Sequence, residues 1–372
     1  MKIGVPKESN DYRVALVPAT IEKLKALGLE ILIEKDAGLA ASFPDEAYQN
    51  LATIVDRETL LKSADLLASI HPLGADERAK LQKECIMVSL FQSYVDPSII
   101  GTLRGEGRMA FSMDMIPRTT LAQSMDVLSS MASVAGYRAV LTACMHLPRY
   151  FPMMITAAGS IRPAKVLILG AGVAGLQAIA TARRLGAMVE ASDVRTAAKE
   201  EVESLGAKFV EVEGATDDTS AGGYAVKQSA EFLKRQQEEV QRRAAKADVV
   251  ITTAQVRGSK APVLLPKTTV DQMKPGSVIV DLAASQGGNC ELTQDNAVIQ
   301  HNGVTIVGDS NLPAGMPQDA SLLFGNNLLN FLKLIVADGA LKIDLAHEIV
   351  GSACITATEE EKAAAAETAT AS

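Results

Sequence analysis

Short apolar runs alternate with amphipathic stretches along most of this 372-residue chain. Near the start, two apolar, β-branched runs are typical of buried strands, and helical spacing marks the stretch between them. In chain order these segments are KIGVPKE, TIEKLKALGLEIL and ILIEKDAG, and the same alternation returns in SADLLASI and ECIMVSLF. The pattern predicts a first open α/β domain over residues 1–125.

A second and more regular series of predicted strands follows. It comprises the runs AKVLILG, AMVEASD, KFVEV, ADVVITTA, SVIVDLA and VTIVGDS. These runs end in small or acidic residues, and helical segments separate them, which is typical of a doubly wound parallel sheet. The sequence therefore predicts a Rossmann domain over residues 126–319.

Two long helices are predicted to join the domains. One runs from Arg118 to about Leu147, and the other is DASLLFGNNLLNFLKLIV, which has an apolar stripe at three- and four-residue spacing. The second helix returns the chain to the first domain, which therefore also takes residues 320–358. The predicted fold class is α/β, with two Rossmann-like doubly wound parallel-sheet domains joined by long helices. Residues 359–372, rich in Ala and Thr, are predicted to be a low-complexity tail rather than a folded element.

Composition narrows the classes of function. The chain is 48% hydrophobic and carries a net charge of −8, without a run of Lys and Arg, which argues against a nucleic-acid partner. Its four cysteines are scattered, so free thiols in a reducing cytosol and no metal site are expected. The N-terminus MKIGVPKES is unlike a signal peptide, and no eighteen apolar residues run uninterrupted. We therefore expect a cytoplasmic chain without a membrane span.

A glycine-rich turn is the clearest chemical signal. Gly170, Gly172 and Gly175 follow the predicted strand AKVLIL and open the predicted helix LQAIATARRLG. In a dinucleotide-binding turn the first glycine permits the tight turn, the second lets the backbone approach a pyrophosphate, and the third lets helix and strand pack closely. The N-terminus of the helix then binds the phosphates. The alternative is a structural strand-to-helix turn that binds nothing.

Asp193 stands at the end of the next predicted strand, in ASDVR. An acid about twenty residues beyond the glycines accepts hydrogen bonds from the adenosine ribose hydroxyls and repels a 2′-phosphate, which favours NAD over NADP. Arg195 weakens that preference, although a solvated surface charge is an equally good interpretation of this residue.

A dehydrogenase acting on a hydroxy or amino acid also needs a general acid or base near the nicotinamide. The chain has four histidines, and none follows a recognisable strand of the nucleotide domain with an orienting carboxylate nearby. We interpret them as structural or surface residues, with His71 in ASIHPL the open case; the others are His146, His301 and His347.

With these features in place, the chain resembles a known family, the NAD(H)-binding component of the proton-translocating nicotinamide nucleotide transhydrogenases, and more distantly alanine dehydrogenase. The resemblance covers nearly the whole chain. It is carried by KIGVPKE, RVALVP, PRTTLAQSMDVLSSMASVAGYRAV, MITAAGSIRPAKVLILGAGVAGLQAIATARRLGA, DVR, KEEVESLGAKF, GGYA, ITTA, PGSVIVDLAASQGGNC and LLFGNNLLNFL.

Alanine dehydrogenase carries proton-handling residues at three landmarks where this chain has Ser69, Phe91 and Ser285. Arg13 matches the arginine that holds the substrate carboxylate there, but the transhydrogenases share it, and a structural salt bridge is the better interpretation. The resemblance therefore implies direct hydride transfer between two nicotinamides, which requires no proton at the reacting carbons. Such transfer instead requires two rings held close together with water excluded.

The resemblance also implies site residues in PRTTLAQSMD and beyond it. Gln123 would orient the nicotinamide ribose and the second nucleotide, while Arg118 and Asp126 would hold each other and the carboxamide, with Ser129 also at the cofactor. The plainer alternatives are that Asp126 caps the following helix and that Arg118 is a surface residue.

Further cofactor contacts are implied around the glycine turn. Tyr224, preceded by Gly222 and Gly223, resembles the tyrosine of a mobile loop that folds over bound nucleotide. Gln255 follows ITTA, where the family's apolar residue and proline are replaced by QVRG, so this contact would be made by a different side chain here. The predicted cofactor-binding residues are Ser129, Gly170, Gly172, Val173, Gly175, Asp193, Val194, Arg195, Gly223, Tyr224 and Gln255.

The resemblance implies that the chain is the NAD(H)-binding part of a split alpha subunit. It would dock with a separate NADP(H)-binding domain, form a homodimer, and associate with the inner membrane through membrane subunits that translocate protons. Two alternatives stay open, namely a stand-alone alanine dehydrogenase-like enzyme and a non-catalytic NAD(H)-sensing module.

Overall fold

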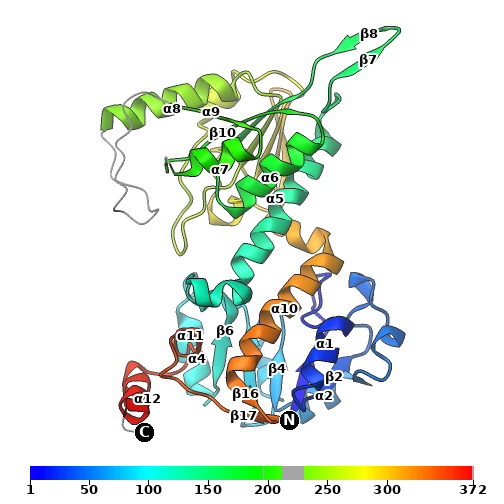
Figure 1. Ribbon diagram of the computed structural model, residues 1–372, viewed down its shortest axis with the longest axis vertical. Coiled ribbons are helices and arrows are strands. Elements are labelled where there is room, and N and C mark those ends of the chain that lie inside the picture. Colours follow the sequence, from blue (N-terminus) through cyan, green and yellow to red (C-terminus); the bar gives the residue numbers. More distant parts are fainter. Residues whose placement is uncertain (196, 212–229, 371–372) are drawn as a thin grey trace. The chain divides into compact units, whose positions relative to one another are not determined.

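The computed structural model describes residues 1–195, 197–211 and 230–370. The chain forms two compact units, which are described one at a time (Figure 1). Unit 1 comprises Met1–Met131 and Pro313–Ser372, and unit 2 comprises Ala132–Leu312. Both are α/β, and each contains its own parallel sheet.

Unit 1 is built on a six-stranded sheet in the order β3-β2-β1-β4-β5-β6. Every pairing in it is parallel, and the order places β1 and β4 at the centre, as in doubly wound folds. The strands are β1 (Lys2–Val5), β2 (Glu30–Glu34), β3 (Thr53–Val55), β4 (Leu66–Ala68), β5 (Ile86–Ser89) and β6 (Ala110–Ser112).

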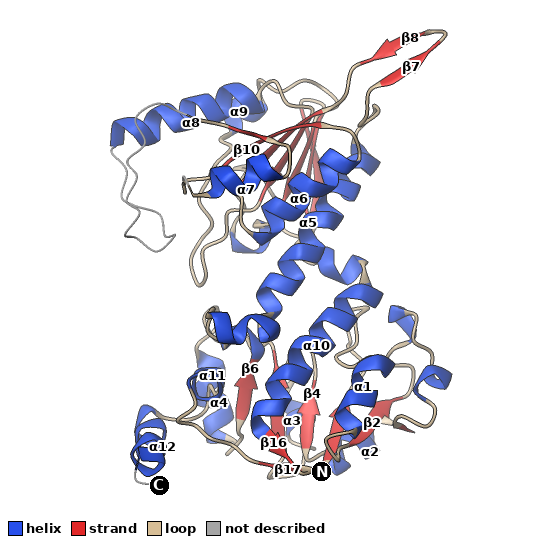
Figure 2. Ribbon diagram, in the orientation of Figure 1, coloured by secondary structure: helices blue, strands red, loops and turns tan. Residues whose placement is uncertain are grey.

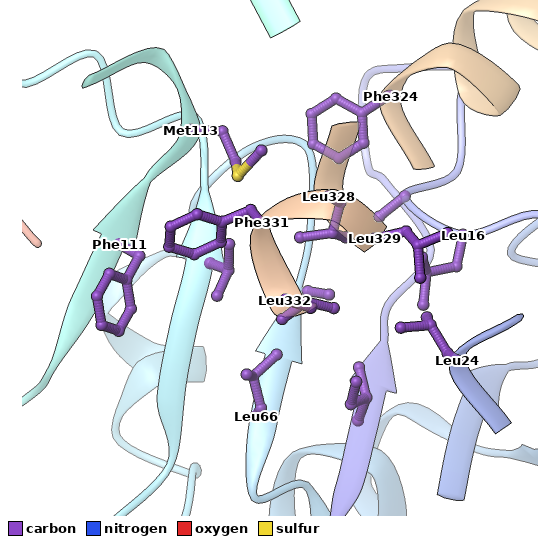
Figure 3. Close-up of a cluster of buried hydrophobic side chains, with 14 of the residues drawn as sticks. Leu16, Leu24, Leu66, Phe111, Met113, Phe324, Leu328, Leu329, Phe331 and Leu332 are labelled. Atoms are coloured by element: carbon purple, nitrogen blue, oxygen red, sulfur yellow. The ribbon is translucent and has the colours of Figure 1, made fainter. Parts of the chain in front are cut away.

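The helices of unit 1 include one contributed from far along the sequence. That helix, α10 (Pro317–Ile335), buries Phe324, Leu328, Phe331 and Leu332 against the sheet, with Phe331 next to Phe111 (Figure 3). The remaining helices are α1 (Pro18–Lys25), α2 (Arg57–Ser63), α3 (Ala75–Arg78), α4 (Ser98–Gly105), α11 (Glu348–Ala353) and α12 (Glu359–Thr370), and a short hairpin follows α10, β16 (Val336–Ala337) and β17 (Ala340–Leu341).

The C-terminal segment differs from the predicted low-complexity tail, because residues 359–370 form helix α12. The cause is a capping box at its start. Thr358 Oγ1 accepts a hydrogen bond from the Glu361 N–H, while the Glu361 carboxylate accepts one from the Thr358 N–H at 2.7 Å. The alanines that suggested low complexity are also the strongest helix formers.

Unit 2 is built on a seven-stranded sheet in the order β11-β10-β9-β12-β13-β15-β14. All pairings are parallel except that of β14 with β15 at one edge. The strands are β9 (Lys165–Leu169), β10 (Met188–Ser192), β11 (Lys208–Phe209), β12 (Val249–Thr252), β13 (Val278–Asp281), β14 (Ala297–His301) and β15 (Val304–Gly308).

Helices cover both faces of this sheet (Figure 2). Alternate residues of β9 point to opposite cores, Ile168 among side chains of α5, α6 and α7, and Leu167 among those of α8 and α9. This arrangement explains why the strands are continuous apolar runs. The helices are α5 (Val127–His146), whose residues up to Met131 belong to unit 1, α6 (Val173–Arg184), α7 (Ala198–Ser204), α8 (Ala230–Ala244) and α9 (Lys267–Val270). A hairpin of β7 (Met154–Thr156) and β8 (Gly159–Ile161) precedes β9.

Helix α5 is the one helix in the described parts of the chain that is long and apolar enough to cross a membrane by length and composition. The sequence predicted no such span. Ala139, Val140 and Ala143 of this helix are fully buried in the core of unit 2. A Cβ on Gly136 would lie 2.1 Å from the Ala174 carbonyl oxygen, so α5 and α6 are in close contact there. Core helices of globular domains share this composition, so the feature is weak evidence for a span.

Candidate functional site

The carboxyl ends of β9 and β12 lie side by side in unit 2, at the position where the strand order reverses. In the sheet, β10 and β11 lie on one side of β9. The chain then crosses over, so that β12 and β13 lie on the other side of β9. Gly170 follows β9, and Thr253, which follows β12, donates its hydroxyl hydrogen to the Gly170 carbonyl at 3.1 Å. Open α/β sheets bind ligands at this kind of switch point.

Glycine occupies each of the three positions of the turn for a different structural reason. Gly170 has φ +102°, and a Cβ there would lie 2.4 Å from the Thr253 hydroxyl oxygen. A Cβ on Gly175 would lie 1.9 Å from the Gly170 carbonyl oxygen, so only glycine lets α6 approach the turn. A Cβ on Gly172 would meet nothing within 4 Å. The space in front of Gly172 and the first turn of α6 therefore suits a phosphate group, which would use the N–H groups of that turn.

Asp193 follows β10 and bonds to the turn itself. Its Oδ2 accepts a hydrogen bond from the Ala171 N–H at 2.7 Å, and its Oδ1 accepts one from Arg195 Nε at 3.0 Å. The Asp193 side chain is 8% exposed and that of Arg195 is 36% exposed. The structure thus places the predicted acid beside the glycine turn, with its charge paired to Arg195. The hydrogen bond that Arg195 donates to Asp193 raises the pKa of the Arg195 guanidinium.

The other predicted residues of unit 2 flank this turn. Val173 begins α6 and is 38% exposed, and Val194 is 54% exposed between Asp193 and Arg195. Gln255 follows β12, and its side-chain amide donates a hydrogen bond to the Leu282 carbonyl at 2.6 Å. Gly223 and Tyr224 lie outside the described residues.

Sequence reasoning missed two buried polar residues beside the ends of β12 and β13. Asp281 is fully buried and accepts hydrogen bonds from five donors: the N–H groups of Ala283, Asn289 and Cys290 and the hydroxyls of Thr252 and Thr293. The Asn289 side chain bridges backbone groups of Ala254 and Pro262. The sequence feature that could have indicated Asp281 is a predicted strand that ends in an acid, shortly before QGGNC. In the structure, a Cβ on Gly288 of that motif would lie 2.9 Å from Asp281 Oδ2.

Unit 1 brings three of the other predicted residues together. Asp126 accepts hydrogen bonds from the Ser129 N–H at 2.9 Å and from the Ser129 hydroxyl at 2.6 Å. Arg118 Nε lies 3.5 Å from the Asp126 carboxylate, and Arg118 Nη2 donates to the Ser129 hydroxyl at 3.3 Å. Asp126 therefore caps α5, as in the plainer alternative, and also pairs with Arg118, while its contact with the carboxamide stays a prediction. Gln123 is exposed in the preceding 3₁₀ turn, Thr120–Met125.

A second polar cluster lies in unit 1 near the ends of β1 and β4. Arg13 is 4% exposed and donates Nε and Nη2 hydrogen bonds to Asp11 at 2.9 and 2.6 Å, the structural salt bridge that the sequence favoured. His71 Nε2 lies 2.9 Å from the same carboxylate, and Glu8 accepts the Ile70 N–H at 2.6 Å. His71 therefore has the orienting carboxylate that was not anticipated.

The two acids of this cluster have pKa values shifted in opposite directions. Burial opposes ionisation of Asp11, but hydrogen bonds from Arg13 and His71 outweigh it and hold the pKa of Asp11 well below its ordinary value. For Glu8, burial outweighs the hydrogen bonds from Ile70 and His71, so its pKa is raised.

The positions that match the proton-handling residues of alanine dehydrogenase carry no acid or base. Ser69 and Phe91 are buried in unit 1, and Ser285 is exposed in unit 2. The other histidines take structural or surface positions, since His301 pairs with Asp271 at 2.6 Å and His347 accepts the Ile349 N–H at the start of α11. His146 is exposed at the end of α5.

The residues that the structure describes contain no group of three or more His, Cys, Asp or Glu that could hold a metal ion. The four cysteines are free, with Cys85, Cys290 and Cys354 buried and Cys144 half-buried. Burial raises the pKa of Cys144 to about 11 and that of Cys85 to about 12, so both are protonated at neutral pH.

Comparisons with known proteins agree with this layout. Residues 4–135 match the family model for the N-terminal domain of alanine dehydrogenase/PNT, and residues 139–362 match the model for its C-terminal domain. The chain is 44% identical over 369 residues to the first part of NAD(P) transhydrogenase subunit alpha from Rhodospirillum rubrum, covering 96% of each chain.

Solved structures give the same result. The transhydrogenase from Sinorhizobium meliloti superposes with a TM-score of 0.88 at 41% identity, covering 95% of this chain and 98% of that chain. An L-alanine dehydrogenase superposes with a TM-score of 0.80 at 25% identity, covering 95% and 94%. The chain therefore belongs to the alanine dehydrogenase/PNT family, and within it to the chains that form the first part of a split NAD(P) transhydrogenase alpha subunit.

Proposed function

We propose that this chain binds NAD(H) at the glycine turn of unit 2 and passes hydride directly to NADP⁺ held by a partner domain. The observation that carries the proposal is the open space in front of Gly172, at the start of α6 and beside Asp193. A bound nicotinamide supplies the hydride at its C4 carbon. The steps that follow concern what the residues of this chain do around it.

In unit 2, the α6 N-terminus and the Gly172 backbone bind the pyrophosphate, and Asp193 with Arg195 binds the adenosine ribose. The predicted contacts of Val173, Val194 and Gln255 complete the groove around this half of the cofactor. The buried Asp281 supports them, because its five hydrogen bonds tie the end of β12 to the segment that follows β13. Asp193 Oδ1 accepts the backbone N–H and Nε of Arg195, and Oδ2 accepts the Ala171 N–H and Arg195 Nη2. A carboxylate has about four acceptor sites, so the Arg195 side chain must release Asp193 when the ribose hydroxyls bind.

In unit 1, Arg118, Asp126 and Ser129 position the nicotinamide, and Gln123 faces the ribose and the second nucleotide. The hydrogen bonds of Ser129 and the ion pair with Arg118 fix the Asp126 carboxylate, so the group that orients the carboxamide is pre-organised. Gln123 is exposed and therefore accessible to a partner domain. Gly223 and Tyr224, in the sequence outside the described residues, are proposed to contact bound nucleotide as well.

The absence of acid and base groups at Ser69, Phe91 and Ser285 supports this reaction. Hydride transfer from carbon to carbon moves no proton at the reacting atoms, so these positions have no proton to handle. An amino-acid dehydrogenase would require a general acid or base there.

As the first part of a split alpha subunit, the chain works with other transhydrogenase subunits. We propose that these comprise an NADP(H)-binding domain and membrane subunits that couple hydride transfer to proton translocation. The chain would form a homodimer and associate peripherally with the inner membrane through those subunits.

The test is to mix the purified chain, NADH and an oxidised NADP analogue, with and without a recombinant NADP(H)-binding domain. Absorbance of the reduced analogue reports transfer. Fast reduction that requires the partner domain supports the proposal. Tight NADH binding with no transfer to any partner would instead support an NAD(H)-sensing module.

A second candidate, an alanine dehydrogenase-like activity, is favoured by one observation, the His71–Asp11 pair. Ammonium-dependent reduction of pyruvate by NADH, lost in His71→Gln, would support it. We expect no such activity, because the buried Ser69 stands at one of the three positions where alanine dehydrogenase carries a proton-handling residue.

A further inference from the structure

A pocket lies in unit 2, at the opposite end of the sheet from the glycine turn. It is a pocket of about 450 Å³ at the amino ends of β9, β10 and β11, closed on its sides by the last turns of α6 and α8. Lys165 begins β9, whereas Gly170 follows the end of the same strand. Five residues of strand separate the two sites by roughly 16 Å.

The pocket is lined by an unusual concentration of positive charge. Six cationic side chains line it against a single acid, Glu190; they are Lys165, Arg183, Lys208, Arg242, Arg243 and Lys246. This excess stands in a chain whose net charge is −8. The sequence shows no long run of Lys and Arg that would reveal the site, because these six residues come from four separate segments that only the fold brings together.

Ion pairing within the pocket leaves most of this charge uncompensated. Glu190 pairs with Arg243 at 2.6 Å, and Glu239 pairs with both Arg242 and Arg243. The other four cations, Lys165, Arg183, Lys208 and Lys246, form no ion pair with any acid in the described ranges. Their positive charge is therefore available to an incoming anion.

Helix stability explains part of this charge but not all of it. Arginines in the last turns of α6 and α8 interact favourably with the negative ends of the helix dipoles. Lys165 and Lys208 open strands, and Lys246 lies in the loop before β12, so the helix dipole gives no reason for them. The pocket also has an apolar part, since Met188 is 53% exposed and Val189 is buried beside it.

We propose that this basic pocket binds a small polyphosphate anion, separately from the NAD(H) site. A chain of two or three phosphates offers enough negative charge to engage Lys165, Arg183, Lys208 and Lys246 together, and arginine pairs well with phosphate oxygens. Two sources carry this chemistry. One is inorganic triphosphate, and the other is a nucleoside triphosphate, whose base would lie on Met188.

The test is calorimetric titration of the full chain with sodium triphosphate and, separately, with ATP, without divalent cations. NADH is present at saturation so that the glycine turn is occupied and cannot take either ligand. We expect one site per chain, with affinity falling steeply between low and high salt. Tighter binding of ATP than of triphosphate would assign the nucleotide source, and equal or weaker binding of ATP would assign the inorganic one.

Two neighbouring arginines provide the matched variants. Arg183 lines the pocket and Arg184 does not, although both are exposed in the last turn of α6. Arg183→Gln should weaken binding about tenfold, and the double variant Lys165→Gln with Lys208→Gln should weaken it further, while Arg184→Gln changes it less than about twofold. An unchanged thermal midpoint checks that each variant folds. No binding by the parent chain, or equal loss in Arg183→Gln and Arg184→Gln, would overturn the proposal.

Discussion

Asp193 accepts two hydrogen bonds from Arg195 through a single carboxylate oxygen, one from the backbone N–H at 2.8 Å and one from Nε at 3.0 Å. The acid expected to select NAD is therefore paired with a cation two residues away. A 2′-phosphate approaching this pair meets both charges. Discrimination between NADH and NADPH consequently depends on Arg195 as well as on Asp193.

Replacing Arg195 should sharpen the preference for NADH. In Arg195→Gln the positive charge that attracts a 2′-phosphate is lost, so we expect NADPH affinity to fall about five- to tenfold while NADH affinity changes less than about threefold. Fluorescence titration of both nucleotides measures this. Equal losses for the two nucleotides would show that Arg195 does not sense the 2′ position.

Two alanine substitutions in the glycine turn should affect stability and NADH binding differently. Gly175→Ala places a Cβ 1.9 Å from the Gly170 carbonyl oxygen and should cost about 1–3 kcal/mol of unfolding free energy. Gly172→Ala meets no protein atom within 4 Å, and its backbone, φ −75° and ψ −168°, accepts alanine. We expect its stability within about 0.5 kcal/mol of the parent.

NADH binding separates the two variants further. If Gly172 faces the pyrophosphate, Gly172→Ala should weaken NADH binding at least about tenfold although the fold is intact. Denaturant unfolding and NADH titration on the same samples provide the measurement. A Gly172→Ala chain that binds NADH normally would remove the pyrophosphate from this turn.

The two roles of Asp126 can be separated by choice of substitution. Asparagine is as good an N-cap as aspartate, so Asp126→Asn should keep stability within about 0.5 kcal/mol, whereas Asp126→Ala should lose about 1 kcal/mol. Both remove the ion pair with Arg118. Hydride transfer to the partner domain should therefore fall at least about tenfold in both, and normal transfer in Asp126→Asn would reduce Asp126 to a helix cap.

The Asp11 cluster predicts how stability depends on pH. Because the folded pKa of Asp11 lies below its ordinary value of 3.8, its ionisation stabilises the fold above that pH, and this contribution is lost as pH falls below 3.8. Glu8 has the opposite sign: its folded pKa is raised above 4.5, so it destabilises the fold as pH rises through that raised value.

Two conservative variants check this assignment. Asp11→Asn should remove part of the fall in unfolding free energy below pH 3.8. Near neutral pH its unfolding free energy should be lower by about 3–5 kcal/mol, because the buried Arg13 keeps its charge. Glu8→Gln should remove the decrease in unfolding free energy that Glu8 causes as pH rises above 4.5. Unfolding free energies measured from pH 2 to pH 8 distinguish the two variants. If stability below pH 3.8 depends on pH in Asp11→Asn as it does in the parent chain, that dependence belongs to other carboxylates.

Features local in sequence were predictable, and features assembled by the fold were not. The glycines, Asp193 and the strands that precede them are set by local pattern, and the structure places them together at the switch point. The five hydrogen bonds of Asp281 join three separate segments, so one acid at the end of a strand could not reveal them. The His71–Asp11 pair likewise joins residues 60 positions apart.

The C-terminal helix and the basic pocket are two further features that were not predicted from the sequence. The capping box of Thr358 and Glu361 was visible in the sequence, but the Ala-rich composition obscured it. The pocket required knowing that Lys165, Arg183 and Lys208 meet at one end of a sheet, which depends on strand order rather than on any local run of charge.

The most direct test of the central claim follows the hydrogen itself. NADH carrying two deuterium atoms at C4 is mixed with this chain, the NADP(H)-binding partner domain and NADP⁺ in ordinary water, and the reduced product is examined by mass spectrometry. Direct transfer predicts one deuterium in every NADPH formed, with no hydrogen from the solvent at that position. NADPH without deuterium would show that hydrogen passes through an exchangeable group, and it would contradict hydride transfer between the two nucleotides.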